Sequence, residues 1–302
     1  MKTLLLVAFL LPVTPACIWI DGTSIDGGHV SVGGQRASSS LRRAIESSPH
    51  DILLRFIDRV DESEDAELTA VTNLLDGKTE QAIASLLVLE KQKPGSYTLA
   101  TNLGTAYELH GDNQNALKWI CEGIKRNPES HHGTEWLHQL ILETKIEFEK
   151  DSHLLQQQQL ITLPEEFDEN TLVRIGNKER KISEIRLALA YQLGERLVFV
   201  KPTDPLVANL LFSYARITAR TGTVEDGLEV LKISKEYGFQ DTVRLETLQG
   251  KYQQIIFIRQ LKKYGLIAAG VTLFVIILIW MYRKKWFFMS RKDYEKHQDL
   301  TE

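Results

Sequence analysis

The stretch TNLGTAYELHGDNQNALKWICEGIKRNP, residues 101–128, carries small residues at positions where a surface helix would tolerate a side chain of any size. Two antiparallel helices joined by a short turn approach closely only if the facing positions lack bulk, which predicts contacts at Gly104 and Ala116. Gly111 suits the turn, because glycine adopts a left-handed backbone at little cost. Pro128 ends the second helix. The stretch therefore predicts a tightly packed helical hairpin.

The pattern recurs at a distance of 34 residues. Sliding the chain against itself by 34 positions pairs residues of the same kind: Gly77 with Gly111, Ala82 with Ala116, Leu86 with Ile120 and Pro94 with Pro128. This period resembles the tetratricopeptide repeat, in which each unit is a pair of antiparallel helices. The unit that begins at Tyr97 supplies the core residues typical of that family: Leu103, Gly104, Tyr107, Ala116 and Pro128. The resemblance implies an all-α, helical-repeat (TPR-like) solenoid.

The repeats do not fill the chain. A third unit begins at Ala208, with Tyr214, Ala215, Gly222 and Gly227 at equivalent positions. Between the two groups of repeats the sequence is polar and contains a proline, which indicates an insertion or linker. A small β-hairpin is predicted inside it, turning at Gly176–Asn177. The Gly-rich segment near the N-terminus reads as extended, and two short helices follow it, around 41–45 and 49–60. We expect these helices to cap the end of the solenoid.

Both ends of the chain indicate a membrane protein. The first 16 residues combine Lys2, an apolar run and a small residue at Ala16, which is typical of a secretory signal peptide. Gly265–Tyr282 is a run of 18 residues without a charge, about 27 Å of helix and long enough to span a bilayer core. More Lys and Arg residues follow this run than precede it, which predicts that the tail is cytoplasmic and the body extracytoplasmic, on the periplasmic side of a cell envelope.

The expected organisation is a signal peptide, an extended and capping segment, TPR-like repeats, an insertion, further helical repeats, a transmembrane helix and a basic tail: residues 1–16, 17–60, 61–150, 151–181, 182–262, 264–282 and 283–302.

Composition narrows the function. A net charge of -4 leaves no basic footprint for nucleic acid. Cys17 and Cys121 are too few for a disulfide framework. Cys17 would stand at the start of the mature chain, so a lipid anchor on this residue is an alternative form of membrane attachment. The sequence contains no phosphate loop, nucleophile elbow or dinucleotide fingerprint, and we expect neither a cofactor nor catalysis.

The family resemblance implies a binding function. Repeats of this kind stack into a curved array whose first helices line a groove for a protein or peptide partner. At the family's groove positions this sequence is acidic and polar, and we predict a partner-binding groove from these residues: Glu64, Glu67, Thr98, Thr101, Thr105, Glu108, His132, Glu135 and Gln139. The chain is therefore interpreted as a membrane-anchored scaffold.

A second class of protein stays open. His131, Glu135 and His138 follow one another at i, i+4 and i+7, which would place them on one face of a helix. Glu135 and His138 have the Glu-x-x-His spacing of carboxylate-bridged metal sites. The alternative is thus a metal-dependent hydrolase of the cell envelope. We interpret the three residues instead as a solvated part of the groove, because histidines at a helix start are ordinary surface residues.

Overall fold

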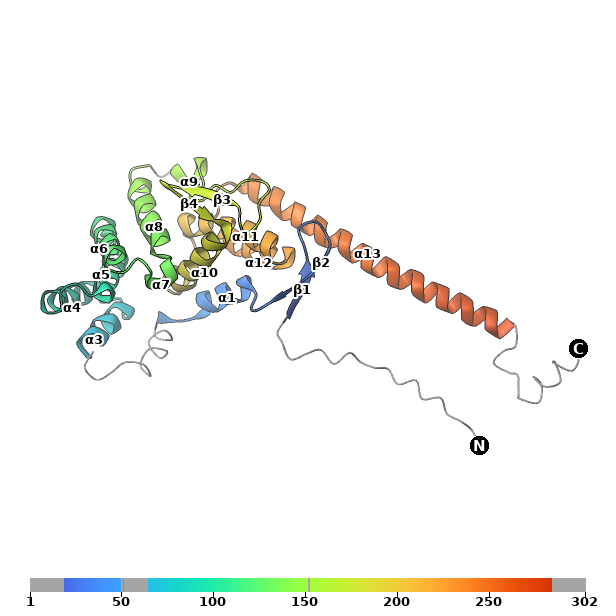
Figure 1. The fold of residues 1–302 in the computed structure, drawn as a ribbon, viewed down its shortest axis with the longest axis horizontal. Coiled ribbons are helices and arrows are strands. Elements are labelled where there is room, and N and C mark those ends of the chain that lie inside the picture. Colours follow the sequence, from blue (N-terminus) through green and yellow to red (C-terminus); the bar gives the residue numbers. More distant parts are fainter. Residues whose placement is uncertain (1–18, 50, 52–64, 152, 284–302) are drawn as a thin grey trace, which may run out of the picture.

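The computed structural model describes residues 19–49, 51, 65–151 and 153–283 of the 302-residue chain (Figure 1). Five features predicted from the sequence lie wholly or mostly outside these residues: the signal peptide, Cys17, Glu64, the helix expected around 49–60 and the basic tail after Arg283. The regular secondary structure of the described part consists of helices and two antiparallel strand pairs. The predicted fold class, a helical-repeat array with a long apolar helix and a small hairpin, is confirmed.

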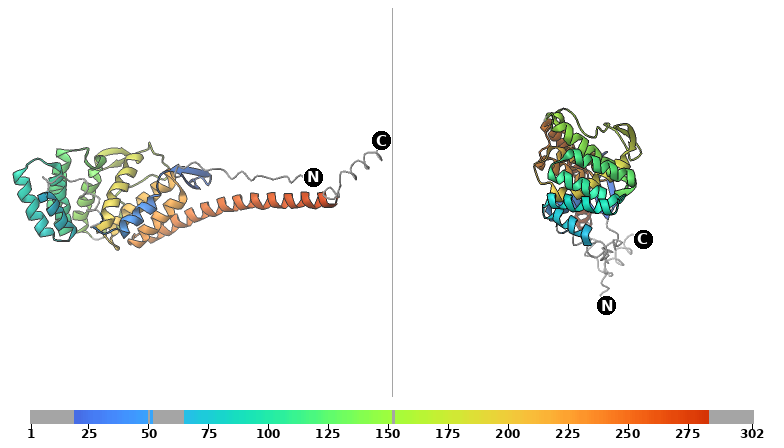
Figure 2. Two further views of the ribbon diagram at one scale, coloured as in Figure 1. Left: turned by 90° about the horizontal axis from the view of Figure 1, so that it is seen from below. Right: turned by 90° about the vertical axis from the view of Figure 1, so that its left-hand side faces the viewer.

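The first group of helices matches the repeat period. They stack in chain order, each against the next, at one end of the molecule (Figures 1 and 2). The helices are α3 (Asp65–Leu75), α4 (Thr79–Gln92), α5 (Tyr97–His110) and α6 (Asn113–Arg126). Gly111 has φ of 91° and ends α5, as its predicted role in the turn requires. The side chains of Ser96 and Asp112 cap the N-termini of α5 and α6, where they accept hydrogen bonds from backbone N–H groups.

Two glycines permit the closest helix contacts. A Cβ added to Gly104 on α5 would lie 2.5 Å from Cδ1 of Ile120 on α6. The second case occurs between α11 (Pro205–Thr221) and α12 (Val224–Glu236). A Cβ on Gly227 would lie 2.5 Å from Cβ of Ala219. The spacing of small residues therefore reflects backbone proximity in both groups of repeats.

The segment after α6 differs from the helix read from its sequence. His131 and His132 have φ of 50° and 60°, and Gly133 has φ of 69°, so α7 (Ser130–Gly133) is a left-handed turn. The regular helix α8 begins only at Glu135 and ends at Phe148. Left-handed backbone is costly for residues with a Cβ, and such outliers persist where surrounding contacts impose them. His131 is therefore not on the helix of Glu135 and His138, as its spacing suggested.

The segment read as an insertion or linker is part of the core. It contains α9 (Leu154–Gln157) and the hairpin β3 (Leu172–Ile175) and β4 (Lys178–Lys181), which turns at Gly176–Asn177 as predicted. Between them, residues 158–167 form an extended strap along α11. Three large side chains of this strap are buried in the main hydrophobic core: Ile161, Leu163 and Phe167.

Four polar side chains of α11 hold the strap by its main chain. Asn209 Oδ1 accepts from Leu160 N at 3.0 Å, and Ser213 Oγ donates to the Ile161 carbonyl at 3.2 Å. Arg216 donates to the carbonyls of Leu163 and Pro164, and Arg220 donates to those of Glu165 and Phe167. These α11 residues are spaced by one turn, so one face of the helix is covered along its length.

The N-terminal segment packs onto this second half of the molecule. The hairpin β1 (Trp19–Thr23) and β2 (His29–Gly33) contacts α12, and α1 (Ala37–Glu46) packs on α12 and α10 (Ile182–Phe199). Asp226 of α12 caps α1, because its carboxylate accepts from Ala37 N at 2.8 Å and Ser38 N at 3.0 Å. The helix thus covers α10 and α12 rather than the first repeat, where we expected a cap.

The last helix, α13 (Thr242–Arg283), is unbroken through its whole length. Leu245 and Tyr252 at its start are buried against the body, whereas the apolar run from Gly265 onward is exposed (Figure 2). Its most apolar window of 18 residues has a mean hydropathy of 2.4. By length and composition this helix can cross a membrane, and it joins the body without a linker.

Candidate functional site: a charged cleft between α5, α8 and α10

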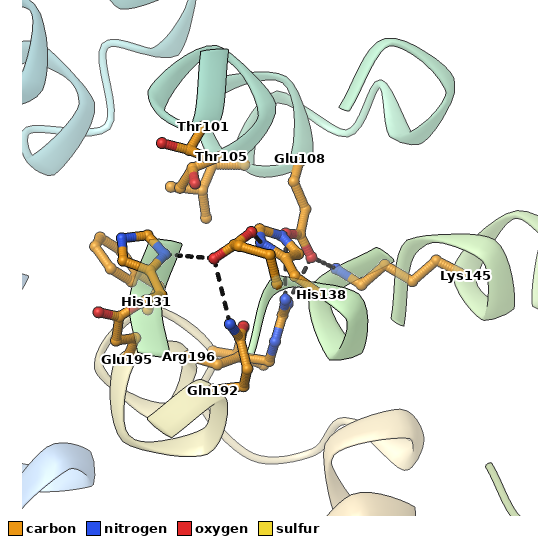
Figure 3. Close-up of a pocket in the computed structure, with 13 residues that line it drawn as sticks. Thr101, Thr105, Glu108, His131, His138, Lys145, Gln192, Glu195 and Arg196 are labelled. Carbon is orange, nitrogen blue, oxygen red and sulfur yellow. Dashed lines mark hydrogen bonds and ion pairs between the residues drawn. The ribbon is translucent and has the colours of Figure 1, made fainter. Parts of the chain in front are cut away.

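The candidate site is a cleft of about 110 Å³ where the first group of repeats meets α10 (Figure 3). It lies between three hydrophobic clusters, one within α3–α5, one between α6 and α8, and one around α10–α13. Four of the nine predicted groove residues line it: Thr101, Thr105, Glu108 and Glu135. His131 and His138, named in the alternative interpretation as a metal site, line it too, whereas Arg196 and Gln192 of α10 and Lys145 of α8 were not predicted.

Glu108 is the hub of the ion pairs in this cleft. Its carboxylate accepts from Arg196 Nη1 at 2.5 Å, Lys145 Nζ at 2.6 Å and His138 Nε2 at 2.7 Å. Its side chain is 6% exposed. Burial alone would raise the pKa of Glu108, but Arg196, His138 and Lys145 together hold this pKa well below its ordinary value. A single buried carboxylate therefore joins α5 to both α8 and α10.

Glu135 forms the second centre. Its Oε1 pairs with His131 Nδ1 and lies 3.5 Å from Gln192 Nε2. Its Oε2 lies 3.5 Å from His138 Nδ1 but accepts no hydrogen bond within the described residues. Burial would raise the pKa of Glu135, but the hydrogen bond from His131 and the nearby ring of His138 together lower this pKa to about 2. The carboxylate is thus ionised although Glu135 is only 2% exposed.

The two histidines respond in the opposite direction. The hydrogen bond to Glu135 raises the pKa of His131 above its ordinary value. Burial would lower the pKa of His138, but its bonds to Glu108 and Glu135 raise it overall. Each histidine therefore favours its protonated form within the cleft. His131 also stacks on Tyr191 of α10, with ring centroids 5.4 Å apart, so the left-handed turn packs on α10.

Four further predicted groove residues, all within the described part of the chain, lie outside the cleft. Glu67, Thr98 and Gln139 are half-buried, and His132 is exposed. The three half-buried side chains form hydrogen bonds with Asn102, Ser96 and Glu143, respectively. Thr101 is 6% exposed, and its hydroxyl donates to the carbonyls of Tyr97 and Thr98. Our interpretation of Glu135 and His138 as solvated is wrong, because both are buried by α10.

The cleft does not have the arrangement of a metal site. His138 has both ring nitrogens directed at carboxylates, and His131 Nδ1 is held by Glu135. In the part of the chain that the structure describes, no group of three or more His, Cys, Asp and Glu side chains is placed to hold a metal ion. The Glu-x-x-His spacing therefore leads here to ion pairs between side chains.

The repeat-core residues fall where two helices meet. Leu103 and Ala116 are fully buried, and Tyr107 packs between two of the hydrophobic clusters. Gly104 faces Ile120 rather than Ala116, and Pro128 stands exposed just after the end of α6. The sequence located these positions because their spacing is local to one helical hairpin.

Comparison with known proteins identifies no family for this chain. No protein-family model matches it, and no curated protein matches it. Among solved structures, one match is titled "Structure of Naa15/Naa10 bound to HypK-THB", at 16% sequence identity and a TM-score of 0.28. The match covers 81% of this chain, which spans 36% of the length of that one. The class defined by the fold is that of TPR-like helical-repeat proteins.

Proposed function

We propose that the chain is a membrane-anchored, non-catalytic scaffold that binds a protein or peptide partner outside the cytoplasm. The observation that carries this proposal is the cleft between α5, α8 and α10, because it gathers groove positions of two successive repeats into one concave site. Concave, partly apolar sites with a few convergent polar groups are the usual binding sites of proteins. The resemblance to peptide-binding repeats agrees with this reading.

The strap limits where a partner binds. In the repeat register, Asn209 and Arg216 of α11 occupy the positions that Thr98 and Thr105 occupy on α5. On α11 these positions hold residues 158–167 of the same chain. On α5 they are half-buried and face no comparable segment among the described residues. The inner face of the first repeats, defined here by Glu67, Thr98 and Thr105, is therefore our proposed partner surface, and it adjoins the cleft because Thr105 belongs to both.

The anchor sets the orientation of this surface. Because α13 runs without a break from its buried start into the apolar run, the body is joined rigidly to the membrane helix. The excess of basic residues after the apolar run supports a cytoplasmic tail. Single cysteines introduced at Lys232 and Lys292, in a chain whose Cys17 and Cys121 are replaced by serine, test this with labelling of intact spheroplasts by an impermeant maleimide. We expect labelling at position 232 only, and the reverse result would invert the topology.

Partner binding is tested on the full-length chain in its native membrane. Site-specific cross-linking from Thr98 or Thr105 identifies partners, and binding is then measured for Glu67→Lys and Thr105→Arg. We expect both substitutions to weaken binding about tenfold or more, as hot-spot changes do. Lys118→Glu and Lys125→Glu are matched controls, because both side chains are exposed on α6. Unchanged binding by the inner-face variants would refute the proposed surface.

A further inference from the structure

We propose that two copies of the chain pair in parallel through α13, and that their contact begins outside the membrane. The contact surface is a juxtamembrane stripe of four apolar side chains just before the uncharged run: Phe257, Ile258, Leu261 and Tyr264. This surface is separate from the inner face of the first repeats, so the pairing is a second interaction beside partner binding. It uses the membrane helix of the proposed function but not the partner surface.

The stripe faces away from the body. On one side of α13, Tyr252 is buried, Ile256 packs against the main core, and Arg259 donates to Thr23 and pairs with Glu225. Successive helical residues are about 100° apart, so the stripe lies on the opposite side of the helix. Its three largest side chains are 61–62% exposed: Phe257, Leu261 and Tyr264. The other residues of this segment are polar: Arg259, Gln260, Lys262 and Lys263.

Lipid does not cover the upper part of the stripe. At a rise of about 1.5 Å per residue, Phe257 stands about 12 Å above Gly265, where the uncharged run begins. The headgroup layer on each side of the hydrocarbon core is only about 5–8 Å thick. Leu261 and Tyr264 fall within this layer, whereas Phe257 stands above it in water. Large apolar side chains gathered on one exposed face mark a protein contact.

The spacing of the stripe fits a parallel pair of helices. Phe257, Leu261 and Tyr264 are separated by four and then three residues, the alternation that keeps one seam of a helix against its partner. In this register, Glu246 and Lys251 take the g and e positions beside the seam, and both are exposed. Side chains at these positions form ion pairs between parallel helices. The seam positions nearby are exposed and uncharged: Thr247, Gly250 and Gln254.

A second copy is the occupant that fits these features. Glu246 and Lys251 are five residues apart, so the carboxylate of one copy meets the ammonium of the other when the helices are parallel and in register, and the ion pair forms twice in a symmetric dimer. Copies with one membrane helix share one orientation in the bilayer, which enforces parallel pairing. Figure 2 shows α13 along one edge of the body, so two bodies would stand on the outer sides of the helix pair.

Disulfide cross-linking in native membranes tests the surface. Single cysteines are placed at positions 257 to 264 in turn, in a full-length chain whose Cys17 and Cys121 are replaced by serine. We expect the yield of cross-linked dimer to peak at 257, 261 and 264 and to be at least about tenfold lower at 262 and 263, which the register places off the seam. A yield independent of position, or cross-linking to a different protein instead of a second copy, would overturn the proposal.

Dimerisation of the full-length chain in lipid vesicles is then measured by energy transfer between differently labelled copies. Phe257→Asp and Leu261→Asp should each weaken it about tenfold or more. Lys262→Asp is the matched control, next to Leu261 but off the seam, and should not change it. All three side chains are exposed in the single chain, so thermal melting of the body should stay unchanged. Wild-type dimerisation by both stripe variants would refute the pairing.

Charge reversal tests the register. Glu246→Lys replaces each ion pair across the seam by two like charges and should weaken dimerisation about threefold or more at low salt. The double variant Glu246→Lys, Lys251→Glu exchanges the charges and should restore it. Weakening that the double variant does not reverse would contradict the parallel, in-register arrangement.

Failure of the pairing and failure of the proposed function give different results. A monomeric chain whose inner-face variants still weaken partner binding refutes the pairing alone. A dimeric chain whose partner binding is independent of the inner face refutes the proposed partner surface alone.

Discussion

The first half of the molecule, α3 to α8, and the second half, α10 to α13, pack their helices in the same way. They differ in what covers the inner face. In both, a glycine lets two helices approach until a Cβ would clash, Gly104 in the first repeats and Gly227 in the second. In the second half, α11 holds the strap by its main chain, and Phe167 of the strap is buried. In the first half, the inner face remains polar and half-buried.

The comparison shows that a repeat motif determines how helices pack but not what lies on them. Small residues at fixed spacing bring two helices together in either half. The occupant of the inner face is decided by other residues, such as the arginines of α11 that pair with strap carbonyls. Among the described residues, the inner face of the first half carries no such set, and Glu108 of α5 instead forms ion pairs with Lys145 of α8 and Arg196 of α10.

The largest expected effect is on the strap. Phe167→Ala removes a side chain that is 8% exposed, belongs to the main core and lies under Arg220, whose guanidinium is 5.0 Å from the ring centroid. We expect a loss of about 3–5 kcal/mol in the free energy of unfolding. Denaturant unfolding of the full chain in detergent measures it. Val88→Ala on α4, where the side chain is 52% exposed, is the control and should change stability by less than about 0.5 kcal/mol.

If Phe167→Ala lowered the free energy of unfolding no more than the control does, the strap would be only loosely attached. The second half would then have an open inner face like the first, and the contrast between them would disappear.

The next effect compares the two glycines. Gly227→Ala places a Cβ 2.8 Å from the backbone of Ala219, which cannot move without shifting α11, so we expect a cost of about 1–3 kcal/mol. Gly104→Ala places a Cβ 2.5 Å from Cδ1 and 2.6 Å from Cγ1 of the buried Ile120, but only 3.2 Å from its backbone N, so a shift of this side chain relieves most of the clash. Alanine also gains up to about 1 kcal/mol of helix propensity. This variant should therefore cost less. Gly250→Ala, where nothing lies within 4 Å of the new Cβ, should be neutral or stabilising.

Thermal melting of the three glycine variants in one detergent ranks them. Equal losses for Gly104→Ala and Gly227→Ala would show that the two helix pairs tolerate the same movement, contrary to the geometry.

The stability of the junction between the two halves, where α8 meets α10 at the cleft, should depend on pH. The pKa of Glu135 is lowered to about 2, so its contribution to stability is present above its unfolded pKa and is lost as pH falls towards 2. The pKa of His131 is raised, so its contribution is present below its unfolded pKa and is lost as pH rises through the folded value. Stability of the junction should thus be highest between these limits, in weakly acidic solution.

Hydrogen exchange of α8 and α10 as a function of pH measures this dependence. Glu135→Gln removes the carboxylate that titrates at low pH and that raises the pKa of His131. The substitution should therefore flatten the dependence of exchange protection on pH, on both the acidic and the neutral side. A profile unchanged by this substitution would show that other groups control the junction.

The sequence predicted the features that depend on neighbouring residues. Gly111 at the helix end and the turn at Gly176–Asn177 are determined by backbone preferences over a few positions. The same local reading missed the left-handed turn, because His131 and His132 carry a Cβ and pack on Tyr191 of α10, which is distant in the sequence. Local reading cannot supply such contacts.

The long-range partners were missed for the same reason. Arg196 and Glu108 are 88 residues apart, and Asp226 caps a helix that begins 189 residues earlier. One signal for the strap was available in the sequence. In the largely apolar stretch of α11, Asn209, Ser213, Arg216 and Arg220 form a polar row one turn apart, which indicates that a hydrogen-bonding segment covers them.

The smallest expected effect concerns how α1 is attached to the second half. Arg42 pairs with Glu236 of α12 at 2.5 Å, but the two side chains are 40% and 46% exposed. Exposed ion pairs contribute about 0–1 kcal/mol, since water screens the charges and both side chains lose freedom. We therefore expect Arg42→Ala to lower the free energy of unfolding by less than about 1 kcal/mol, in denaturant unfolding at low salt. Asp226→Asn, which weakens a buried cap on the same helix, should cost more. If Arg42→Ala cost more than Asp226→Asn, charge at the surface rather than the cap and the buried Leu41 would hold α1, and this helix would detach from the second half at high salt.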